Sequence, residues 1–292
     1  MNQQATSGIH SESVQISHIV TGNPLNIGSG FDALSFKHGQ FSGLMDPLVM
    51  VDHYTMSSPT FGAHPHAGMS ALSILFEDSE GTFNNRDSLG NDIDLLPGDA
   101  YWLKAGSGAI HDEKPTAGSR THGLQIFVNL PKQHKHDNAT ALHVPARDIP
   151  VITGAGYRVR VVLGESNDIR GATSPALPFT ALDAFLESGG TYAHALSGNT
   201  SVTVYAVSGE ITIDIAGKQT TLPKKQAVAI HIEQGNQTLH LCSQNQAHVV
   251  VLQGAPVREP FVQNGPFVMS SLEEIQQVTA KYESGQLGAI GE

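Results

Sequence analysis

Cysteine is almost absent from the sequence: Cys242 is the only one among 292 residues. A lone thiol cannot form an intramolecular disulfide, so the chain is not a disulfide-framed scaffold. Residues 1–18 lack the apolar stretch of about 7–15 residues that marks a signal peptide. No run reaches the roughly 18–20 apolar residues of a membrane span. We therefore expect a cytoplasmic protein with no membrane partner.

Positive charge is also scarce. The chain has 16 Lys and Arg against 27 Asp and Glu, which gives a net charge of −11 at pH 7 with His neutral. A surface of this sign repels phosphate backbones, and the sequence contains no run of Lys or Arg. We expect no direct binding to nucleic acid, so any regulatory role would act through a protein partner.

Charged residues of both signs make up only 15% of the chain, whereas it contains 30 Gly and 15 Pro. This composition predicts many short strands joined by tight turns rather than long helices. Strand patterns recur at 14–20, 46–54, 69–76, 93–96, 100–104, 109–113, 123–130, 157–163, 192–196, 201–207, 210–215, 227–232, 238–241 and 248–252. A short helical turn is expected at 183–186.

The sequence divides into two β-rich halves. Residues 131–150 are polar and bounded by proline, which is typical of a linker between domains. We place the domains at 1–135, which holds the candidate metal ligands, and at 136–292, which does not. The length of the chain is sufficient for two ordinary domains.

One helix is predicted near the end of the chain. Ser271 and Glu274 form a capping box, and Gly285 is suited to end the helix. Apolar side chains recur at helical spacing on one side: Leu272, Ile275, Val278 and Tyr282. The expected fold is therefore all-β, with one C-terminal helix packed on the outside.

Four residues have the pattern of a metal site. His64 and His66 lie at i and i+2, so on a strand their imidazoles point to the same side. Pro65 between them cannot donate a ladder hydrogen bond, which places this strand at a sheet edge or at its entry into the sheet. His111 and Glu113 repeat the spacing beside a glycine-rich turn. Two such pairs facing inward on one sheet would bring together three imidazole nitrogens and one carboxylate oxygen.

This ligand set contains no thiolate and suits one divalent transition metal, such as Fe(II), Mn(II), Ni(II), Co(II) or Cu(II). Four protein ligands on a six-coordinate ion leave two positions for water, dioxygen or a chelating substrate. Two alternatives stay open. The same residues could saturate a four-coordinate structural zinc, or the two pairs could be exposed polar side chains on surface hairpins.

The other histidines are expected to be structural or solvated. His53 lies in a buried strand and is expected in the core rather than at the metal. Asp112 should face away from the metal, because it alternates with His111 and Glu113. Solvated positions are expected in the linker for His134, His136 and His143. The second half contains no equivalent pair of ligands.

Six segments of the chain resemble the pirin family, two-domain members of the cupin superfamily. They are DPLVMVDHY (46–54), HPHAG (64–68), RDSLGN (86–91), LLPGDAYWLKAGSGAIHDE (95–113), GLQIFVNLP (123–131) and REPFVQNGPFVMSSLEEIQQ (258–277). The resemblance implies two antiparallel β-sandwich barrels, with metal only in the N-terminal one. It implies His64, His66, His111 and Glu113 as ligands. Fe(II) is placed first among the metals, with Mn, Ni, Co, Cu or Zn as alternatives.

Some pirins cleave flavonols such as quercetin with dioxygen, and others act as iron-dependent transcriptional cofactors. The resemblance therefore implies a metal-dependent dioxygenase of the quercetin 2,3-dioxygenase type, acting on a flavonol-like aromatic enol and dioxygen. Glu113 would be its catalytic base, taking the proton of the 3-hydroxyl group. The alternative is a non-catalytic, metal-dependent regulatory bicupin that binds a protein partner. A metal-dependent isomerase or a structural bicupin is a third reading.

The chain departs from the common pirin pattern at three positions. Ala67 stands where pirins commonly have Arg, Met69 where they have an aromatic residue, and Asn85 where they often have His. We expect these positions near the rim of the pocket. There they would bear on the choice of substrate more than on metal binding.

Overall fold

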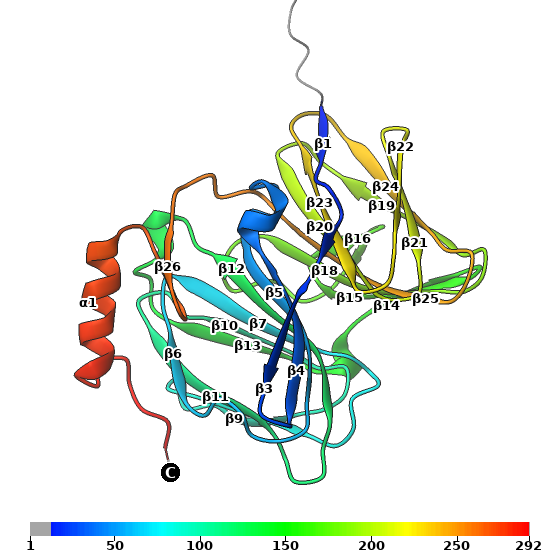
Figure 1. The fold of residues 1–292 in the computed structure, drawn as a ribbon. Helices are drawn as coiled ribbons and strands as arrows, with labels where there is room; N and C mark the ends of the chain where they lie inside the picture. The colour runs from blue at the N-terminus through cyan, green and yellow to red at the C-terminus, as the bar shows by residue number, and fades with distance from the viewer. Residues whose placement is uncertain (1–12, 292) are drawn as a thin grey trace, which may run out of the picture.

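Two antiparallel β-sandwiches and one C-terminal α-helix make up the molecule, described for residues 13–291 in a computed structural model (Figure 1). Each sandwich pairs one large sheet with a four-stranded sheet, and the sheets stay open instead of closing into barrels. The predicted all-β fold, two cupin-type sandwiches with a C-terminal helix, is confirmed. Within residues 13–291 no helix is long and apolar enough to cross a membrane.

The first sandwich contains the residues predicted to bind metal. Its large sheet has the order β13 (Thr140–Val144), β10 (Ala100–Lys104), β7 (Met69–Leu75), β12 (Thr121–Asn129), β5 (Leu48–Met56), β4 (Phe31–Lys37) and β3 (Asn23–Ile27). Its small sheet has the order β6 (His64–His66), β11 (Ala109–Pro115), β8 (Phe83–Asp87) and β9 (Asp92–Leu95). The small sheet therefore carries both predicted pairs of ligands.

The second sandwich repeats this plan. Its large sheet has the order β1 (Val14–Ile16), β23 (Gln226–Ile232), β20 (Thr200–Ser208), β25 (Ala247–Gly254), β18 (Phe179–Leu186), β15 (Tyr157–Leu163) and β14 (Val151–Gly154), with β2 (Val20–Thr21) also paired to β23. Its small sheet has the order β19 (Thr191–Leu196), β24 (Gln237–Cys242), β21 (Ile211–Ile215) and β22 (Lys218–Leu222). The other elements are β16 (Glu165–Ser166), β17 (Ile169–Arg170), β26 (Val262–Asn264), β27 (Phe267–Met269), α1 (Leu272–Glu283) and the 3₁₀ turns η1 (His38–Phe41), η2 (Lys132–His134) and η3 (Ala146–Asp148).

The two large sheets share a core between the sandwiches. The pleat of a strand sends alternate side chains to opposite faces. In β5, Met50, Asp52 and Tyr54 line a cavity inside the first sandwich, whereas Val51 joins the core between the sandwiches. This core includes Phe36, Leu72, Trp102 and Ile126 from the first sheet and Val162, Phe179, Tyr205 and Leu252 from the second. Burial of this apolar surface holds the two halves together.

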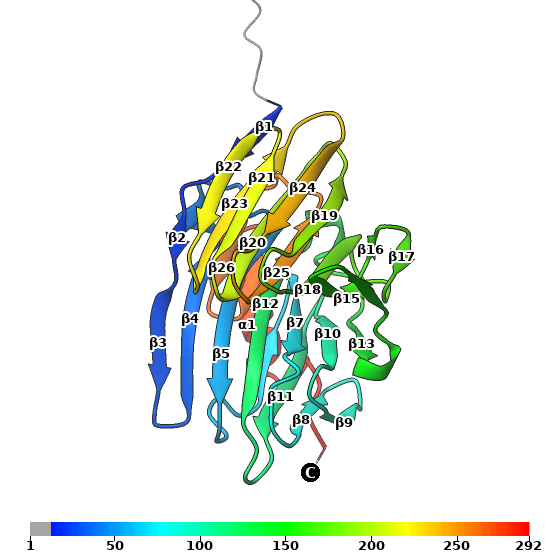
Figure 2. The ribbon, with the colours of Figure 1, turned by 90° about the vertical axis from the view of Figure 1, so that its right-hand side faces the viewer.

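Three segments cross between the two halves. β1 and β2 pair with β23 of the second sandwich before the chain enters β3 of the first, as Figure 2 shows. β13 pairs with β10 of the first sandwich. The β26–β27 hairpin and α1 pack on the first sandwich near β6 (Figure 1). The domain division at 1–135 and 136–292 stays a prediction, and strand pairing crosses it on both sides.

Two local expectations are wrong. Residues 131–150 are not a free linker, because β13 forms the edge of the large sheet and His143 Nε2 lies 2.9 Å from Asp99 Oδ2. An edge strand is half exposed and carries polar residues, so its composition resembles a loop. Residues 183–186 are the end of β18 rather than a helical turn, because β15 and β25 pair with this segment on both sides.

The C-terminal helix forms where the capping box predicts it. Ser271 Oγ accepts a hydrogen bond from the Glu274 N–H at 3.2 Å at the start of α1. Ile275 and Val278 are buried against the β26–β27 hairpin, whereas Leu272 is exposed. The apolar face of the helix is therefore narrower than its spacing suggests.

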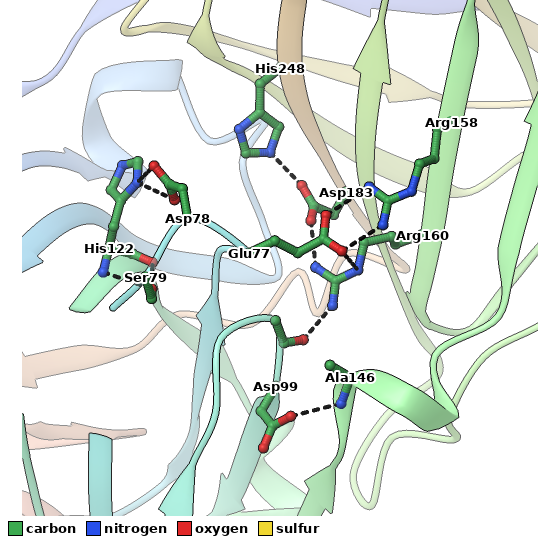
Figure 3. Close-up of polar contacts among 11 residues, drawn as sticks. Glu77, Asp78, Ser79, Asp99, His122, Ala146, Arg158, Arg160, Asp183 and His248 are labelled. Carbon is green, nitrogen blue, oxygen red and sulfur yellow. Dashed lines mark hydrogen bonds and ion pairs between the residues drawn. The ribbon is translucent and has the colours of Figure 1, made fainter. Parts of the chain in front are cut away.

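A buried ion pair lies at the junction of the two sandwiches (Figure 3). Arg160 Nη1 on β15 lies 2.7 Å from Asp183 Oδ2 on β18, and both side chains are almost fully buried. Arg160 also donates to the Gly98 carbonyl of the first half, and His248 donates to Asp183. Burial alone would raise the pKa of Asp183, but His248 and Arg160 together hold it below its usual value. One guanidinium group thus joins the second sandwich to the first.

Replacing Asp183 with Ala should remove the buried carboxylate partner of Arg160 and leave only the partly exposed Glu77, 3.8 Å away, as an ion-pair partner. We expect the free energy of unfolding to fall by about 3–5 kcal/mol, as measured by chemical denaturation at neutral pH. Glu165→Ala is the matched control, because its pair with Arg170 is exposed and its loss should cost less than about 1 kcal/mol. Equal losses in the two variants would contradict the role assigned to Asp183.

Candidate metal centre

Three imidazoles meet at one point inside the first sandwich. His66 Nε2 lies 2.9 Å from His111 Nε2, which lies 3.0 Å from His64 Nε2. One nitrogen atom from each ring lies within 4.8 Å of the other two. The rings come from the adjacent strands β6 and β11 of the small sheet. The structure thus brings together the three histidines that the sequence singles out.

Strand register sets this geometry. β6 is an edge strand, where the missing N–H of Pro65 breaks no central ladder. His64 lies directly opposite His111, and His66 lies opposite Ala109. The small side chain of Ala109 leaves room for the imidazole of His66 above β11. The i, i+2 spacing then turns both rings of β6 toward the same side.

The orientation of two of the rings is fixed by hydrogen bonds at Nδ1, the ring nitrogen that points away from the other imidazoles. His64 Nδ1 lies 2.9 Å from the Gly62 carbonyl, and His66 Nδ1 lies 3.3 Å from the Pro266 carbonyl. A carbonyl only accepts, so each Nδ1 carries a proton and each Nε2 of these neutral rings presents a lone pair. His111 Nε2 carries at most one proton and can satisfy only one of these lone pairs. A cation among the three nitrogens would resolve this conflict, so the residues fit a metal ion.

Burial keeps the imidazoles in the neutral form that binds metal. It lowers the pKa of His66 to about 3, with a further lowering by His64. Burial also lowers the pKa of His64, and it lowers that of His111 strongly. A protonated imidazole has no free lone pair for a metal, so these lowered pKa values favour the metal over the proton.

Glu113 lies beside the three imidazoles rather than among their nitrogen atoms. It lines the same cavity, and its Oε2 lies 3.7 Å from His111 Nδ1. Its Oε1 accepts a hydrogen bond from Ser73 Oγ at 2.6 Å. Burial raises the pKa of Glu113 to about 7, against a lowering by the Ser73 hydrogen bond. The role of Glu113 as fourth ligand stays a prediction.

An apolar cavity of about 140 Å³ adjoins the three imidazoles. Phe61 is 47% exposed and marks the opening of this cavity. Phe127 packs edge-on against His66, with ring centroids 5.1 Å apart. The rest of the apolar wall comprises Phe31, Met50, Met56 and Phe83. An apolar cavity with a few polar groups is the usual form of a small-molecule site.

The β26–β27 hairpin completes the surroundings of His66, and local sequence patterns do not reveal this. Pro266, whose carbonyl faces His66, lies in the turn of that hairpin. Lys135 is almost fully buried, and its Nζ donates to the carbonyls of Gly68 and Val268 at 2.9 and 2.8 Å. Gly68 has a φ of +71°, and a Cβ there would lie 2.0 Å from the Val268 oxygen. Glycine just after the two histidines is therefore needed for the hairpin to approach.

The remaining predicted positions lie away from the imidazoles. His53 is on the other face of β5, where its Nδ1 lies 2.5 Å from the Tyr205 hydroxyl. Asp112 faces away from the cavity toward basic side chains. Asn85, expected near the rim, is fully buried on β8 opposite Glu113. Among the other histidines of 131–150, His136 is exposed and His134 pairs with Asp137.

The interior of the second sandwich is packed with different side chains from that of the first. Aliphatic side chains occupy it, among them Val161, Val204, Ile213, Leu239 and Leu241. His194 is buried, but its two ring nitrogens lie 2.7 Å from Ser166 Oγ and 2.6 Å from Gln253 Oε1. Within residues 13–291, the histidine cluster and its cavity therefore belong to the first sandwich.

An open β-sandwich with converging, inward-facing histidines has the form of a cupin domain with a candidate metal site. Comparison with protein families agrees with the cupin class. Residues 28–128 match the pirin model, and residues 181–288 match the model of the pirin C-terminal cupin domain. The two matches together span more than half of the chain. The chain belongs to the pirin family of bicupin proteins.

Similar proteins match over most of the chain. A Pseudomonas aeruginosa protein named as a candidate quercetin 2,3-dioxygenase is 32% identical, over 91% of this chain and 95% of its own. Mus musculus pirin is 30% identical, over 85% and 84%. A solved quercetin 2,3-dioxygenase from Acinetobacter baumannii is 25% identical with a TM-score of 0.83, over 95% and 99%. An Escherichia coli pirin in complex with nickel(II) shares the fold at 19% identity and a TM-score of 0.62, over 83% and 99%.

Chelator-treated protein titrated with Co(II) should take up one ion per chain. His66→Ala should weaken Co(II) affinity by at least about 100-fold, because losing even an outer partner of a ligand costs about 10–100-fold. The affinity is measured by competition with a chromophoric chelator, and circular dichroism checks the fold. His194→Ala, which removes a buried histidine of the second sandwich, should keep the affinity. An unchanged affinity in His66→Ala would refute the site.

Proposed function

We propose that this protein is a metal-dependent dioxygenase that cleaves a flavonol-type substrate at His64, His66 and His111, with Glu113 as fourth ligand and catalytic base. The observation that carries the proposal is that three neutral, converging imidazoles adjoin an apolar cavity. A purely structural metal would be closed off by its ligands, whereas a catalytic metal keeps an open side. The substrate and dioxygen would approach the metal from the side that faces the cavity.

The ligand set supports Fe(II) as the first candidate, because imidazole and carboxylate without thiolate suit such ions. A divalent transition metal held there would supply Lewis acidity to the substrate oxygen and redox chemistry to dioxygen. Glu113 is suited to accept the enol proton, since its carboxylate lines the same cavity as the imidazoles and lies beside His111. Ser73 would hold Oε1 while Oε2 takes the proton.

The cavity limits how a flavonol can bind. Its volume of about 140 Å³ is smaller than the roughly 300–1,000 Å³ that encloses a drug-sized ligand. A flavonol would therefore enter with its chelating end and leave its far ring near the exposed Phe61. The aromatic side chains Phe31, Phe83 and Phe127 offer faces and edges for a flat ring and keep water away from the reacting atoms.

The names of two relatives support the reaction class, since a P. aeruginosa protein and a solved A. baumannii protein are both named for quercetin 2,3-dioxygenation. Both cover more than nine-tenths of this chain. The single cysteine supports a cytoplasmic location for this activity. The acidic composition supports a small-molecule substrate rather than nucleic acid.

Protein loaded in turn with Fe(II), Mn(II), Ni(II), Co(II) or Cu(II) should consume quercetin in air. The reaction is followed by loss of the visible absorbance of quercetin and by release of carbon monoxide. Glu113→Gln should lower kcat by about 10²–10⁴-fold, the usual contribution of a general base, while the histidines keep the metal. Glu165→Gln changes an exposed glutamate of the second half and should keep wild-type turnover.

The same experiment separates the dioxygenase from the alternative. Metal uptake without turnover by any of the five ions would overturn the dioxygenase proposal. It would leave a non-catalytic, metal-dependent bicupin that binds a protein partner. Full turnover in Glu113→Gln would instead remove Glu113 from the role of base.

A further inference from the structure

The large sheet of the first sandwich presents unpaired polar atoms to the cavity. Asp52 Oδ1, Tyr54 Oη and Gln125 Nε2 are buried and have no hydrogen-bond partner within the protein. Asp52 is 8% exposed and Tyr54 is 3% exposed. All three residues line the cavity that adjoins the imidazoles. A buried donor or acceptor without a partner is costly, so three of them in one cavity indicate a ligand that satisfies them.

Strand geometry places the three side chains together. Asp52 and Tyr54 are two residues apart on β5, so they share the cavity face of the strand. Gln125 on β12 is the direct cross-strand neighbour of Asp52. Ser73 Oγ lies 2.8 Å from Gln125 Oε1 and 2.6 Å from Glu113 Oε1. Its single proton can go to only one of these oxygens, and contact with Ser73 occupies one end of the Gln125 amide while the other end faces the cavity. We call Asp52, Tyr54 and Gln125 the polar floor.

The fold itself does not require polar residues at these places. Met50 and Met56 flank Asp52 and Tyr54 on the same face of β5 and line the same cavity. Apolar side chains are therefore compatible with this face. The polar atoms of Asp52 and Tyr54 are better explained by recognition than by packing.

The polar floor offers both donors and acceptors to a ligand. The Tyr54 hydroxyl can donate, the Asp52 carboxyl oxygen can accept, and Gln125 presents one end of its amide. A hydroxyl group on the ligand can pair with both donors and acceptors, because its oxygen accepts a hydrogen bond and its proton is donated. A carboxylate or phosphate offers no donor to the Asp52 oxygen, and a methyl group would leave all three atoms unpaired.

We propose that the polar floor binds a second hydroxyl group of the substrate while the metal site binds its enol. This inference rests on the proposed function and narrows the substrate class to enols whose ring system carries a further hydroxyl. The substrate would lie between the small sheet, which bears the histidines, and the large sheet, which bears the polar floor. Asp52, Tyr54 and Gln125 set specificity and take no part in bond breaking.

The test compares three ligands in the zinc-loaded protein: 3-hydroxyflavone, 3,7-dihydroxyflavone and 3,4′-dihydroxyflavone. Zn(II) has no redox chemistry, so the ligands survive and Kd can be measured by calorimetry. We expect the wild type to bind one of the two dihydroxyflavones at least about 10-fold more tightly than 3-hydroxyflavone, because the added hydroxyl satisfies several buried groups. Tyr54→Phe should reduce this preference by about 3–10-fold, the value of one hydrogen bond.

Further variants sharpen the test. Asp52→Asn should also reduce the preference, because a neutral amide oxygen is a weaker acceptor than a carboxylate oxygen. Tyr192→Phe is the matched control, since it removes a buried hydroxyl from the second sandwich, and it should keep the preference. Equal affinity of the wild type for all three flavonols, no binding of any, or a preference that survives in Tyr54→Phe and Asp52→Asn overturns the proposal. A Tyr54-dependent preference without turnover by protein loaded with any of the five ions would refute the dioxygenase and support the polar floor.

Discussion

Both faces of the seven-stranded sheet are buried, and the rest of the molecule depends on this constraint. One face lines the cavity beside the imidazoles, and the other packs on the second sandwich. Along β5 the strand period of two assigns Asp52 and Tyr54 to the first face and Val51 and His53 to the second. A slip of one residue would bring a carboxylate into the shared core and an aliphatic side chain into the cavity. One register therefore fixes both the chemistry of the cavity and the contact between the halves.

The two sandwiches fill the same architecture in opposite ways. The second has aliphatic side chains throughout its interior, the simplest stable solution for a β-sandwich. The first keeps three neutral imidazoles with converging nitrogens next to Glu113, whose pKa burial raises. Polar groups in such a place destabilise a core unless a ligand or metal satisfies them. The shared core between the large sheets offsets this penalty, so the first sandwich can keep a reactive interior.

The sequence predicts those parts of the site that depend on local spacing. The i, i+2 period is a local property of a strand, so the convergence of His64 and His66 with His111 can be inferred from two short segments. The carbonyl of Pro266 and the ammonium of Lys135 come from distant segments, and no local sequence pattern predicts their contacts at the site. Asp52 stands in a strand that is buried on both sides, where burial alone does not tell which face a polar residue occupies. β13 has the composition of a loop because it is an edge strand.

Because the β26–β27 hairpin is made late, the candidate metal site is completed only near the end of translation. The ribosome releases the segment 64–113 well before the segment 262–269, and the strands β14 to β25 of the second sandwich are made between them. Until the hairpin arrives, His66 Nδ1 lacks the carbonyl that orients it, and Lys135 lacks one of its acceptors. The imidazoles therefore reach their final orientation only when translation has passed the second sandwich. Any metal that these imidazoles bind would therefore find them in their mature orientation only after both halves have been made and joined.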